Sequence, residues 1–153
     1  MKRLHLIKHA AGAPGLRFFG MGPFCFPCKG LRKLKLLLDE HAFWAKDRDL
    51  NSIRKLLAGS NVVITLWRGM RIIGFGRATS DGIYRAVLWD VVVAGDLQGL
   101  GLGRQVVEAL MSAPAVRKAE RIYLMTTNSS EFYEQLDFKI CTKQKLLIKK
   151  ESL

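Results

Sequence analysis

The chain has 153 residues, about half of them apolar, which suits one domain with one core. No apolar stretch approaches the roughly 20 residues of a membrane-spanning helix. We therefore expect no membrane partner, and the odd number of cysteines argues against a secreted disulfide framework and favours a cytoplasmic protein. The net charge of +12 lies at the two ends of the chain, because residues 61–142 hold 9 basic and 8 acidic side chains, so we do not expect nucleic acid as a partner.

The first 30 residues contain eight glycines and prolines, which interrupt any long element. We predict an irregular N-terminal extension over 1–30, with a short strand at 16–21, and one domain over 31–153. Cys25 and Cys28 have the spacing of zinc ligands, but we interpret them as ordinary thiols in an apolar loop and expect no metal.

Two helices are predicted next. Residues 31–44 carry apolar side chains at helical spacing, with basic residues between them. A second helix over 50–58 starts after Asp49, a residue that caps helices well, and ends at Gly59.

The pattern then changes to strands. Residues 61–67, 71–79 and 84–93 are rich in β-branched and apolar side chains. Turn dipeptides separate them, Arg-Gly at 68–69 and Asp-Gly at 81–82. We therefore predict a three-stranded antiparallel meander.

A glycine-rich turn follows the third strand. Residues 98–104 read Gln-Gly-Leu-Gly-Leu-Gly-Arg and open a helix predicted over 102–111. Such a turn directs backbone N–H groups and the positive end of a helix dipole at one point, which favours a phosphate or pyrophosphate. A tight connection without a ligand is the alternative. A dinucleotide-binding fingerprint is disfavoured, because Arg104 stands where its last glycine belongs and the preceding strands are predicted to be antiparallel.

The last third of the chain adds one parallel strand. Residues 121–126 form a strand that a helix separates from 84–93, so we predict a right-handed parallel crossover. A short helix over 129–136 is capped by Asn128, and 138–148 forms one or two closing strands. The predicted fold is mixed α/β: a central, mostly antiparallel sheet with helices on both faces.

Two segments carry a resemblance to a known family. Residues 88–103 resemble the acetyl-CoA-binding motif of the GNAT (GCN5-related) N-acetyltransferases, with Gln98, Gly101 and Gly103 in its marked positions. Residues 128–138 resemble the Phe/Leu-Tyr-x-x-Leu-Gly-Phe helix of the same family.

Within the family, residues 76–81 and 89–91 are most similar to the plant plastid and cyanobacterial branch. That branch includes enzymes described as serotonin (arylalkylamine) N-acetyltransferases and as protein-lysine acetyltransferases. Asp137 stands where the family has glycine; aspartate tolerates the left-handed conformation that this position often needs.

The resemblance implies a GNAT fold that binds acetyl-CoA as co-substrate, with no metal, and a parallel strand pair that splays around the cofactor. The strand with Val91 to Val93 ends in a bulge and pairs with the pantetheine arm, and a backbone N–H near Val92 or Val93 polarises the thioester carbonyl. The implied cofactor-binding residues are Val91, Val92, Val93, Gln98, Gly99, Leu100, Gly101, Leu102, Gly103, Arg104, Asn128 and Tyr133.

The resemblance also places two catalytic candidates. Tyr133 stands where the family has a general acid for the departing CoA thiolate; the alternative is a packed core tyrosine. Asp90 accepts the proton of the acceptor amine through water, or is a structural carboxylate. Arg104 contacts phosphate or is solvated, and Asn128 caps its helix, touches the pantetheine arm, or does both.

The resemblance therefore implies acetyl transfer to a primary amine by direct attack in a ternary complex. The acceptor we prefer is a small aromatic or alkyl amine, with Trp44 as a candidate wall of its pocket or a core residue. A protein-lysine acceptor is the alternative, and a non-catalytic nucleic-acid-associated protein is the rival from another class. For residues 1–30 three roles stay open: a disordered extension, a lid over the acceptor channel, or the swapped element of a homodimer.

Overall fold

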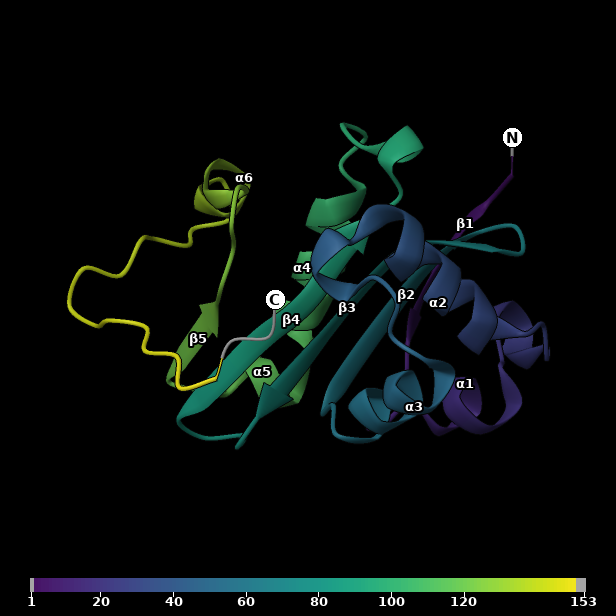
Figure 1. The fold of residues 1–153 in the computed structure, drawn as a ribbon, viewed down its shortest axis with the longest axis horizontal. Coiled ribbons are helices and arrows are strands. Elements are labelled where there is room, and N and C mark those ends of the chain that lie inside the picture. The colour runs from purple at the N-terminus through teal and green to yellow at the C-terminus, as the bar shows by residue number, and fades with distance from the viewer. Residues whose placement is uncertain (1, 151–153) are drawn as a thin grey trace.

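The computed structural model describes residues 2–150 and shows one five-stranded sheet with the order β1-β2-β3-β4-β5 (Figure 1). The strands are β1 Leu4–Lys8, β2 Val62–Arg68, β3 Arg71–Ser80, β4 Arg85–Val93 and β5 Arg121–Leu124. The helices are α1 Pro14–Phe19, α2 Gly30–His41, α3 Leu50–Ala58, α4 Leu102–Ser112, α5 Pro114–Arg117 and α6 Ser130–Glu134. Three single 3₁₀ turns are η1 Pro23–Cys25, η2 Phe43–Ala45 and η3 Gly95–Leu97.

The sheet confirms the predicted meander and crossover. Strands β1 to β4 pair antiparallel, and β4 pairs parallel with β5 from Arg85 opposite Arg121 to Leu88 opposite Leu124. Helices α1, α2 and α3 cover one face, and α4 and α5 cover the other (Figure 1). The interior strand β2 is buried along nearly its whole length, as its continuous apolar sequence requires when both faces are covered.

The helices follow the predicted periodicity. Four leucines of α2 are buried, and α4 presents Leu102, Val106 and Leu110 to the sheet. Asp49 caps α3, because its carboxylate accepts a hydrogen bond from the N–H of Ser52 at 2.7 Å. The predicted first helix is shorter than expected and ends at His41, before η2.

Residues 1–30 are more ordered than the glycine and proline content predicted. Residues 4–8 form the edge strand β1, and a helix, α1, stands where a strand was predicted at 16–21. Pro14 starts this helix, Gly20 ends it in the left-handed conformation, and Leu16 is fully buried in the core. The division of the chain at residue 30 stays a prediction.

The imidazole of His9, the residue directly after β1, makes a polar contact with β2. His9 Nε2 lies 2.8 Å from Thr65 Oγ1, which also accepts a hydrogen bond from Trp67 Nε1. Burial lowers the pKa of His9 to about 4, so this imidazole is neutral at physiological pH.

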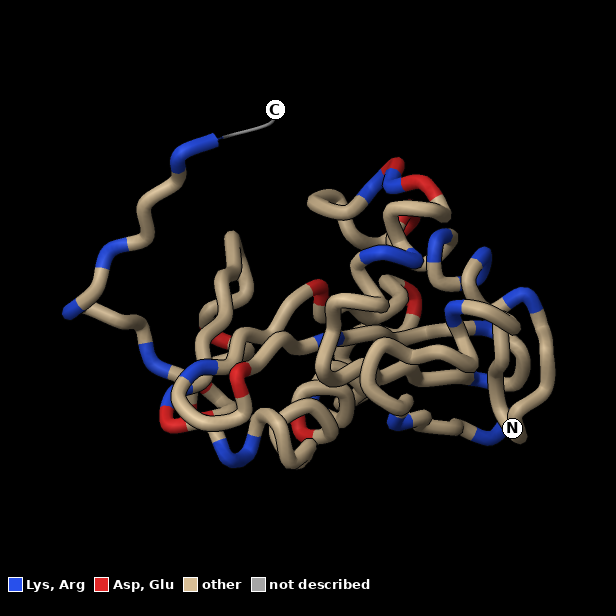
Figure 2. The backbone as a smooth tube through the Cα atoms, turned by 90° about the horizontal axis from the view of Figure 1, so that it is seen from below, with Lys and Arg blue, Asp and Glu red and all other residues tan. Residues whose placement is uncertain are grey.

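The predicted closing strands at 138–148 are wrong. Residues 139–150 form neither helix nor strand and are exposed, and this tail leaves the body of the molecule with its lysines spread along it (Figure 2). Alternating apolar residues form a strand only where they pair with a neighbouring strand, and among the described residues β5 pairs with β4 and not with the tail.

None of the helices between residues 2 and 150 combines the length and the apolar character needed to cross a membrane.

Candidate functional site

Strand β4 carries a bulge in its second half. The register with β3 shifts between Arg77 opposite Trp89 and Phe75 opposite Val92, so Asp90 and Val91 together face Gly76. Asp90 adopts φ 52°, a left-handed conformation that aspartate tolerates better than most residues. The bulge was predicted at the end of the strand that carries Val91 to Val93; it lies at Asp90 and Val91, inside β4.

The bulge coincides with the point where β4 and β5 separate. Their pairing ends at Leu88 opposite Leu124, while β4 continues to Val93. Ala94 donates its N–H to Ile73 of β3, and N–H groups alternate along a strand, so the N–H of Val93 faces the open side. A stretch of β4 backbone is therefore available to a ligand.

A glycine on β3 lets the bulge pack against helix α4. A Cβ atom at Gly76 would lie 2.8 Å from Val106 Cγ1 and 2.9 Å from Leu110 Cδ1, closer than real contacts allow. Glycine at this position therefore lets α4 lie close against the bulged strand without displacing these two side chains.

The side chain of Asp90 is held by three donors from separate segments. Its carboxylate accepts hydrogen bonds from Trp44 Nε1 at 3.1 Å, Arg48 Nη1 at 3.0 Å and Arg77 Nε at 2.8 Å, and 5% of the side chain is exposed. Burial alone would raise the pKa of this carboxyl, but the two arginines outweigh burial and hold the pKa below its usual value. These surroundings argue against the general-base role predicted for Asp90 and favour the structural alternative.

The glycine turn presents unpaired backbone donors. Gly99 and Gly101 have φ 80° and 75°, and a Cβ at either would meet nothing within 4 Å, so the turn faces open space. The first backbone bond of α4 runs from the N–H of Gln105 to the carbonyl of Gly101, and no side chain caps the helix. The N–H groups of the first turn are therefore free to bind an anion.

The third glycine of the motif has a packing role. A Cβ at Gly103 would lie 3.1 Å from Phe132 Cζ, so this residue sets the close approach of α4 and α6. Gln98 Nε2 points back to the carbonyl of Val93 at 3.5 Å, and Arg104 lies near Glu108 and the carbonyl of Gln135, at 3.4 Å from each.

Tyr133 lies on α6 between two aromatic neighbours. Its ring packs edge-on against Phe132 and Phe138, with centroids 4.9 and 5.8 Å away. Burial raises the pKa of Tyr133 to about 12, so the hydroxyl stays protonated at neutral pH. Asn128 does not cap α6: the N-cap is Ser129, and the Asn128 amide oxygen accepts from Ser129 Oγ at 3.3 Å.

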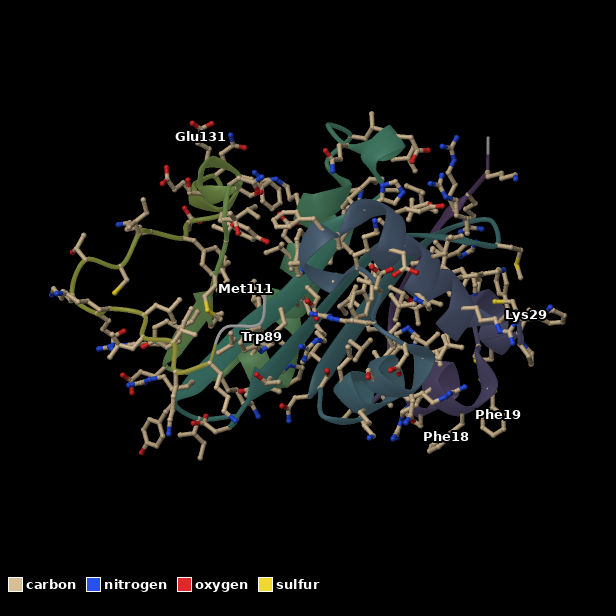
Figure 3. The ribbon with its side chains drawn as sticks, in the orientation of Figure 1. Phe18, Phe19, Lys29, Trp89, Met111 and Glu131 are labelled. Atoms are coloured by element: carbon tan, nitrogen blue, oxygen red, sulfur yellow. The ribbon has the colours of Figure 1, made fainter. Side chains whose placement is uncertain are left out.

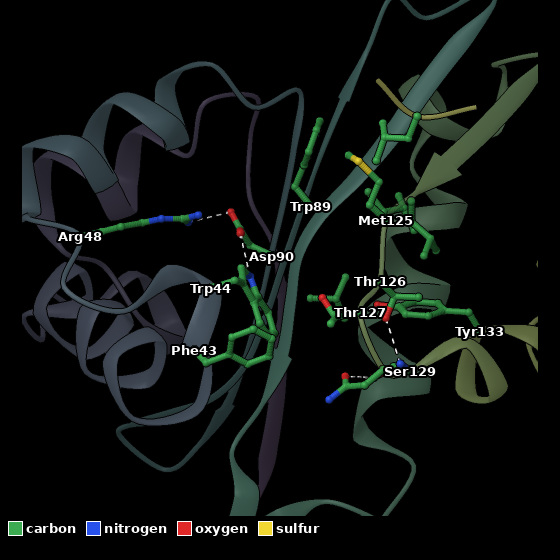
Figure 4. A pocket seen from close by; sticks show the side chains of 15 residues that line it. Phe43, Trp44, Arg48, Trp89, Asp90, Met125, Thr126, Thr127, Ser129 and Tyr133 are labelled. Atoms are coloured by element: carbon green, nitrogen blue, oxygen red, sulfur yellow. Dashed lines mark hydrogen bonds and ion pairs between the residues drawn. The ribbon is translucent and has the colours of Figure 1, made fainter. Parts of the chain in front are cut away.

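These residues border one groove with two halves, which share Val91, Ser129 and Tyr133. The first half, about 480 Å³, holds every residue of the predicted cofactor set except Leu100 and Asn128; we call it the glycine-turn half. The second half, about 460 Å³, is the aromatic half, lined by Phe43, Trp44, Trp89 and the strand β5 side of the groove (Figure 4).

The aromatic half includes Trp44, which the sequence analysis named as a candidate wall of the acceptor pocket, and two residues that sequence reasoning missed, Phe43 and Arg48. Phe43 and Trp44 lie on η2, their rings edge-on at 5.1 Å, and the Asp90 hydrogen bond orients Trp44 (Figure 4). Arg77 could have been singled out from the sequence, because it is a lone charge inside an apolar strand. Arg48 lies in a connecting segment with no sequence pattern that points to it. Within residues 2–150, no three His, Cys, Asp or Glu side chains lie close enough together to hold a metal ion.

Comparison with known proteins agrees with this geometry. Residues 59–140 match the family described as the acetyltransferase (GNAT) domain. The chain is 35% identical over 100 residues to the uncharacterized N-acetyltransferase ycf52 of Pyropia yezoensis, covering 62% of this chain and 57% of that protein. It is 55% identical over 42 residues to the chloroplastic serotonin N-acetyltransferase 2 of Oryza sativa subsp. japonica, covering 28% of this chain and 21% of that protein.

The same fold is found among solved structures. A putative acetyltransferase of the GNAT family from Xanthomonas campestris pv. campestris superposes with a TM-score of 0.73 at 21% identity, over 99% of this chain and 95% of that one. At this identity the likeness shows the fold alone, and the chain spans less than two thirds of the length of the sequence relatives above. Because the domain match covers more than half of its residues, the chain belongs to the GNAT acetyltransferase family.

Proposed function

We propose that this protein transfers the acetyl group of acetyl-CoA to a primary amine by direct attack within a ternary complex. One observation carries the proposal: the free N–H groups of the glycine turn and the unpaired side of β4 border one groove that leads to Tyr133. The pyrophosphate binds at residues 99–104, and the pantetheine arm lies along the open backbone of β4.

In this arrangement, one protein group is assigned to the carbonyl oxygen of the thioester and another to its sulfur. The N–H of Val93 on the open side is the donor we assign to the thioester carbonyl. The amine nitrogen attacks the carbonyl carbon, the carbon–sulfur bond breaks, and the departing thiolate takes the hydroxyl proton of Tyr133, whose phenolate then takes a proton back from water. A protonated tyrosine at neutral pH suits that role.

The proton of the amine passes to water in this scheme. Asp90 is the only acidic residue among those that line the aromatic half, and both of its oxygens are engaged by arginine or tryptophan donors. The acceptor therefore enters as the neutral amine, which predicts turnover that rises with pH toward the pKa of the free amine.

A small aromatic amine is the acceptor we propose. Phe43, Trp44 and Trp89 supply apolar ring surface, and the charge of Asp90 is already balanced by two arginines. A relative of this chain carries serotonin in its name, over a short shared segment. A protein-lysine acceptor remains the second candidate, and a cytoplasmic location remains a prediction, since that relative is named chloroplastic.

The test measures free thiol released from acetyl-CoA with a panel of tryptamine, phenethylamine, hexylamine and a lysine-containing peptide. We expect turnover with amines and the highest kcat/KM for tryptamine. Exclusive use of the peptide would reverse the acceptor assignment. No thiol release with any amine would refute the proposed function, with reactions lacking amine as the control for hydrolysis.

A further inference from the structure

A surface that the groove does not use lies at the other end of the molecule. A hollow of about 320 Å³ is bordered by Phe18, Phe19 and the cations Arg17, Lys29, Arg32 and Arg54; together with Phe24 and Phe26 we call this the basic-aromatic surface. Phe18, Phe19 and Lys29 lie at one end of the molecule, and Glu131 of α6 lies at the opposite end (Figure 3).

The four phenylalanines are unusually exposed. Phe24 is 87% exposed, Phe18 67% and Phe19 64%. Phe24 and Phe26 belong to a loop that a bridge between Met21 and Pro27 closes, and Pro27 also lines the hollow. An exposed apolar patch of this kind, rimmed by polar residues, marks an interaction surface on a folded domain.

The loop holds its outward-facing ring in a strained conformation. Phe24 and Cys25 have φ 59° and 56°, which costs on the order of 1 kcal/mol for each residue that is not glycine. The Phe24 ring packs edge-on against His5 of β1 with centroids 5.0 Å apart. The fold therefore fixes an aromatic side chain at the tip of a loop.

The charge around these rings has one sign. The first 38 residues contain eight lysines and arginines and no acidic residue. The hollow has no acidic lining, and its four cations form no ion pair within residues 2–150. Arg17 lies over the Phe18 ring at 4.4 Å, and its buried Nε has no hydrogen-bond partner among the described residues.

We propose that the basic-aromatic surface docks on the surface of a bilayer that contains anionic lipids. Phenylalanine rings enter the boundary between headgroups and acyl chains, while Arg32, Arg54 and Lys29 pair with lipid phosphates. Phe24 projects from a loop tip rather than from a flat platform, which fits insertion into a bilayer better than the stacking of successive bases.

This inference goes beyond the proposed function and does not depend on it. It revises the sequence-based expectation of no membrane partner, which rested on the lack of a spanning segment, because docking on a surface needs none. No residue that borders the hollow lines either half of the groove, and Trp89 of the aromatic half lies away from Phe18, Phe19 and Lys29 (Figure 3), so the docked protein keeps both halves of the groove open.

Co-sedimentation of the full chain with vesicles tests the proposal. Vesicles of equal parts phosphatidylglycerol and phosphatidylcholine are expected to bind the protein, and pure phosphatidylcholine vesicles are not. Arg32→Gln with Arg54→Gln should weaken binding about 25-fold, since each basic contact contributes about fivefold. Phe18→Ser with Phe19→Ser should weaken binding about tenfold through lost apolar burial.

Matched variants separate local contacts from net charge. Lys143→Gln with Lys145→Gln removes the same charge from the tail, which lies on the opposite side of the molecule from α1 and α2 (Figure 1), and should change binding less than twofold. Circular dichroism and acetyl-CoA binding show that each variant is folded. The proposal is overturned if anionic vesicles do not bind, if the tail variant loses as much as the hollow variant, or if a single-stranded oligonucleotide binds more tightly through the same residues.

Discussion

The two halves of the groove are built in different ways. The glycine-turn half consists mostly of backbone: unpaired N–H groups between residues 99 and 104 and the open side of β4. The aromatic half consists of side chains from η2, the loop after it, β4, β5, the segment after β5, α6 and the tail, which contributes Leu146. Backbone sites need only a short local motif, whereas side-chain sites need partners that are distant in the sequence.

A central tyrosine connects these halves, and its removal gives the largest expected effect on rate. Tyr133→Phe keeps the ring packing against Phe132 and Phe138 but removes the proton that the thiolate takes. We expect kcat to fall about 10²- to 10⁴-fold while the Kd for acetyl-CoA stays within twofold. Steady-state kinetics and calorimetry measure the two quantities.

Tyr84→Phe is the control, since Tyr84 is exposed and lies outside both halves of the groove. If Tyr133→Phe keeps the kcat of the parent protein, Tyr133 is a packing residue.

Breaking the Asp90 contacts has the next largest effect, on stability. Asp90→Asn keeps an acceptor for Trp44 and tolerates the positive φ, but leaves Arg48 and Arg77 without their counter-charge. We expect the free energy of unfolding to fall by about 3 kcal/mol, toward the lower end of the range for buried pairs because both arginines reach solvent. Urea unfolding measures the change.

The pH dependence of that loss follows from the direction of the pKa shift. The pKa of Asp90 is lower in the folded protein than its usual value of 3.8, so the stabilisation is complete above that value and is lost as pH falls through the folded pKa. The difference between parent and Asp90→Asn should be constant from pH 5 to 8 and shrink below pH 4. Asp137→Asn is the control, because Asp137 is exposed at φ 68°; equal losses in the two variants would contradict the account.

The sequence predicted the backbone half better than the side-chain half for a physical reason. Alternating apolar runs, turn dipeptides and the 98–104 glycines are local patterns, and they located the meander, the crossover and the turn. The contacts of Trp44 and Arg48 with Asp90 span 46 and 42 residues, which no local pattern encodes.

The wrong sequence-based predictions also concern segments whose structure depends on contacts with distant residues. The helix at 14–19 depends on burying Leu16 in a distant core, and the tail at 139–150 has the pattern of a strand but no paired neighbour. The predicted cap at Asn128 is one residue from the observed N-cap, Ser129, a common uncertainty at helix ends.

A smaller effect, on the KM for the amine alone, is expected from a substitution in the aromatic half. Trp44→Ala should raise the KM for tryptamine about tenfold through lost ring contact, and leave the KM for acetyl-CoA unchanged. Trp44→Phe should restore most of the affinity for tryptamine. An equal rise in both KM values would mean that Trp44 supports the whole groove rather than the acceptor.

The central claim is that the glycine turn binds the pyrophosphate of acetyl-CoA, and calorimetric titration of acetyl-CoA tests it most directly. Gly101→Glu adds strain at φ 75° and a negative charge facing the ligand, whereas Gly82→Glu makes the same change at φ 77° in a hairpin outside the groove. We predict measurable affinity for the parent protein, a loss of about 100-fold or more in Gly101→Glu, and none in Gly82→Glu. A parent protein without affinity for acetyl-CoA, or equal losses in the two variants, would contradict the account.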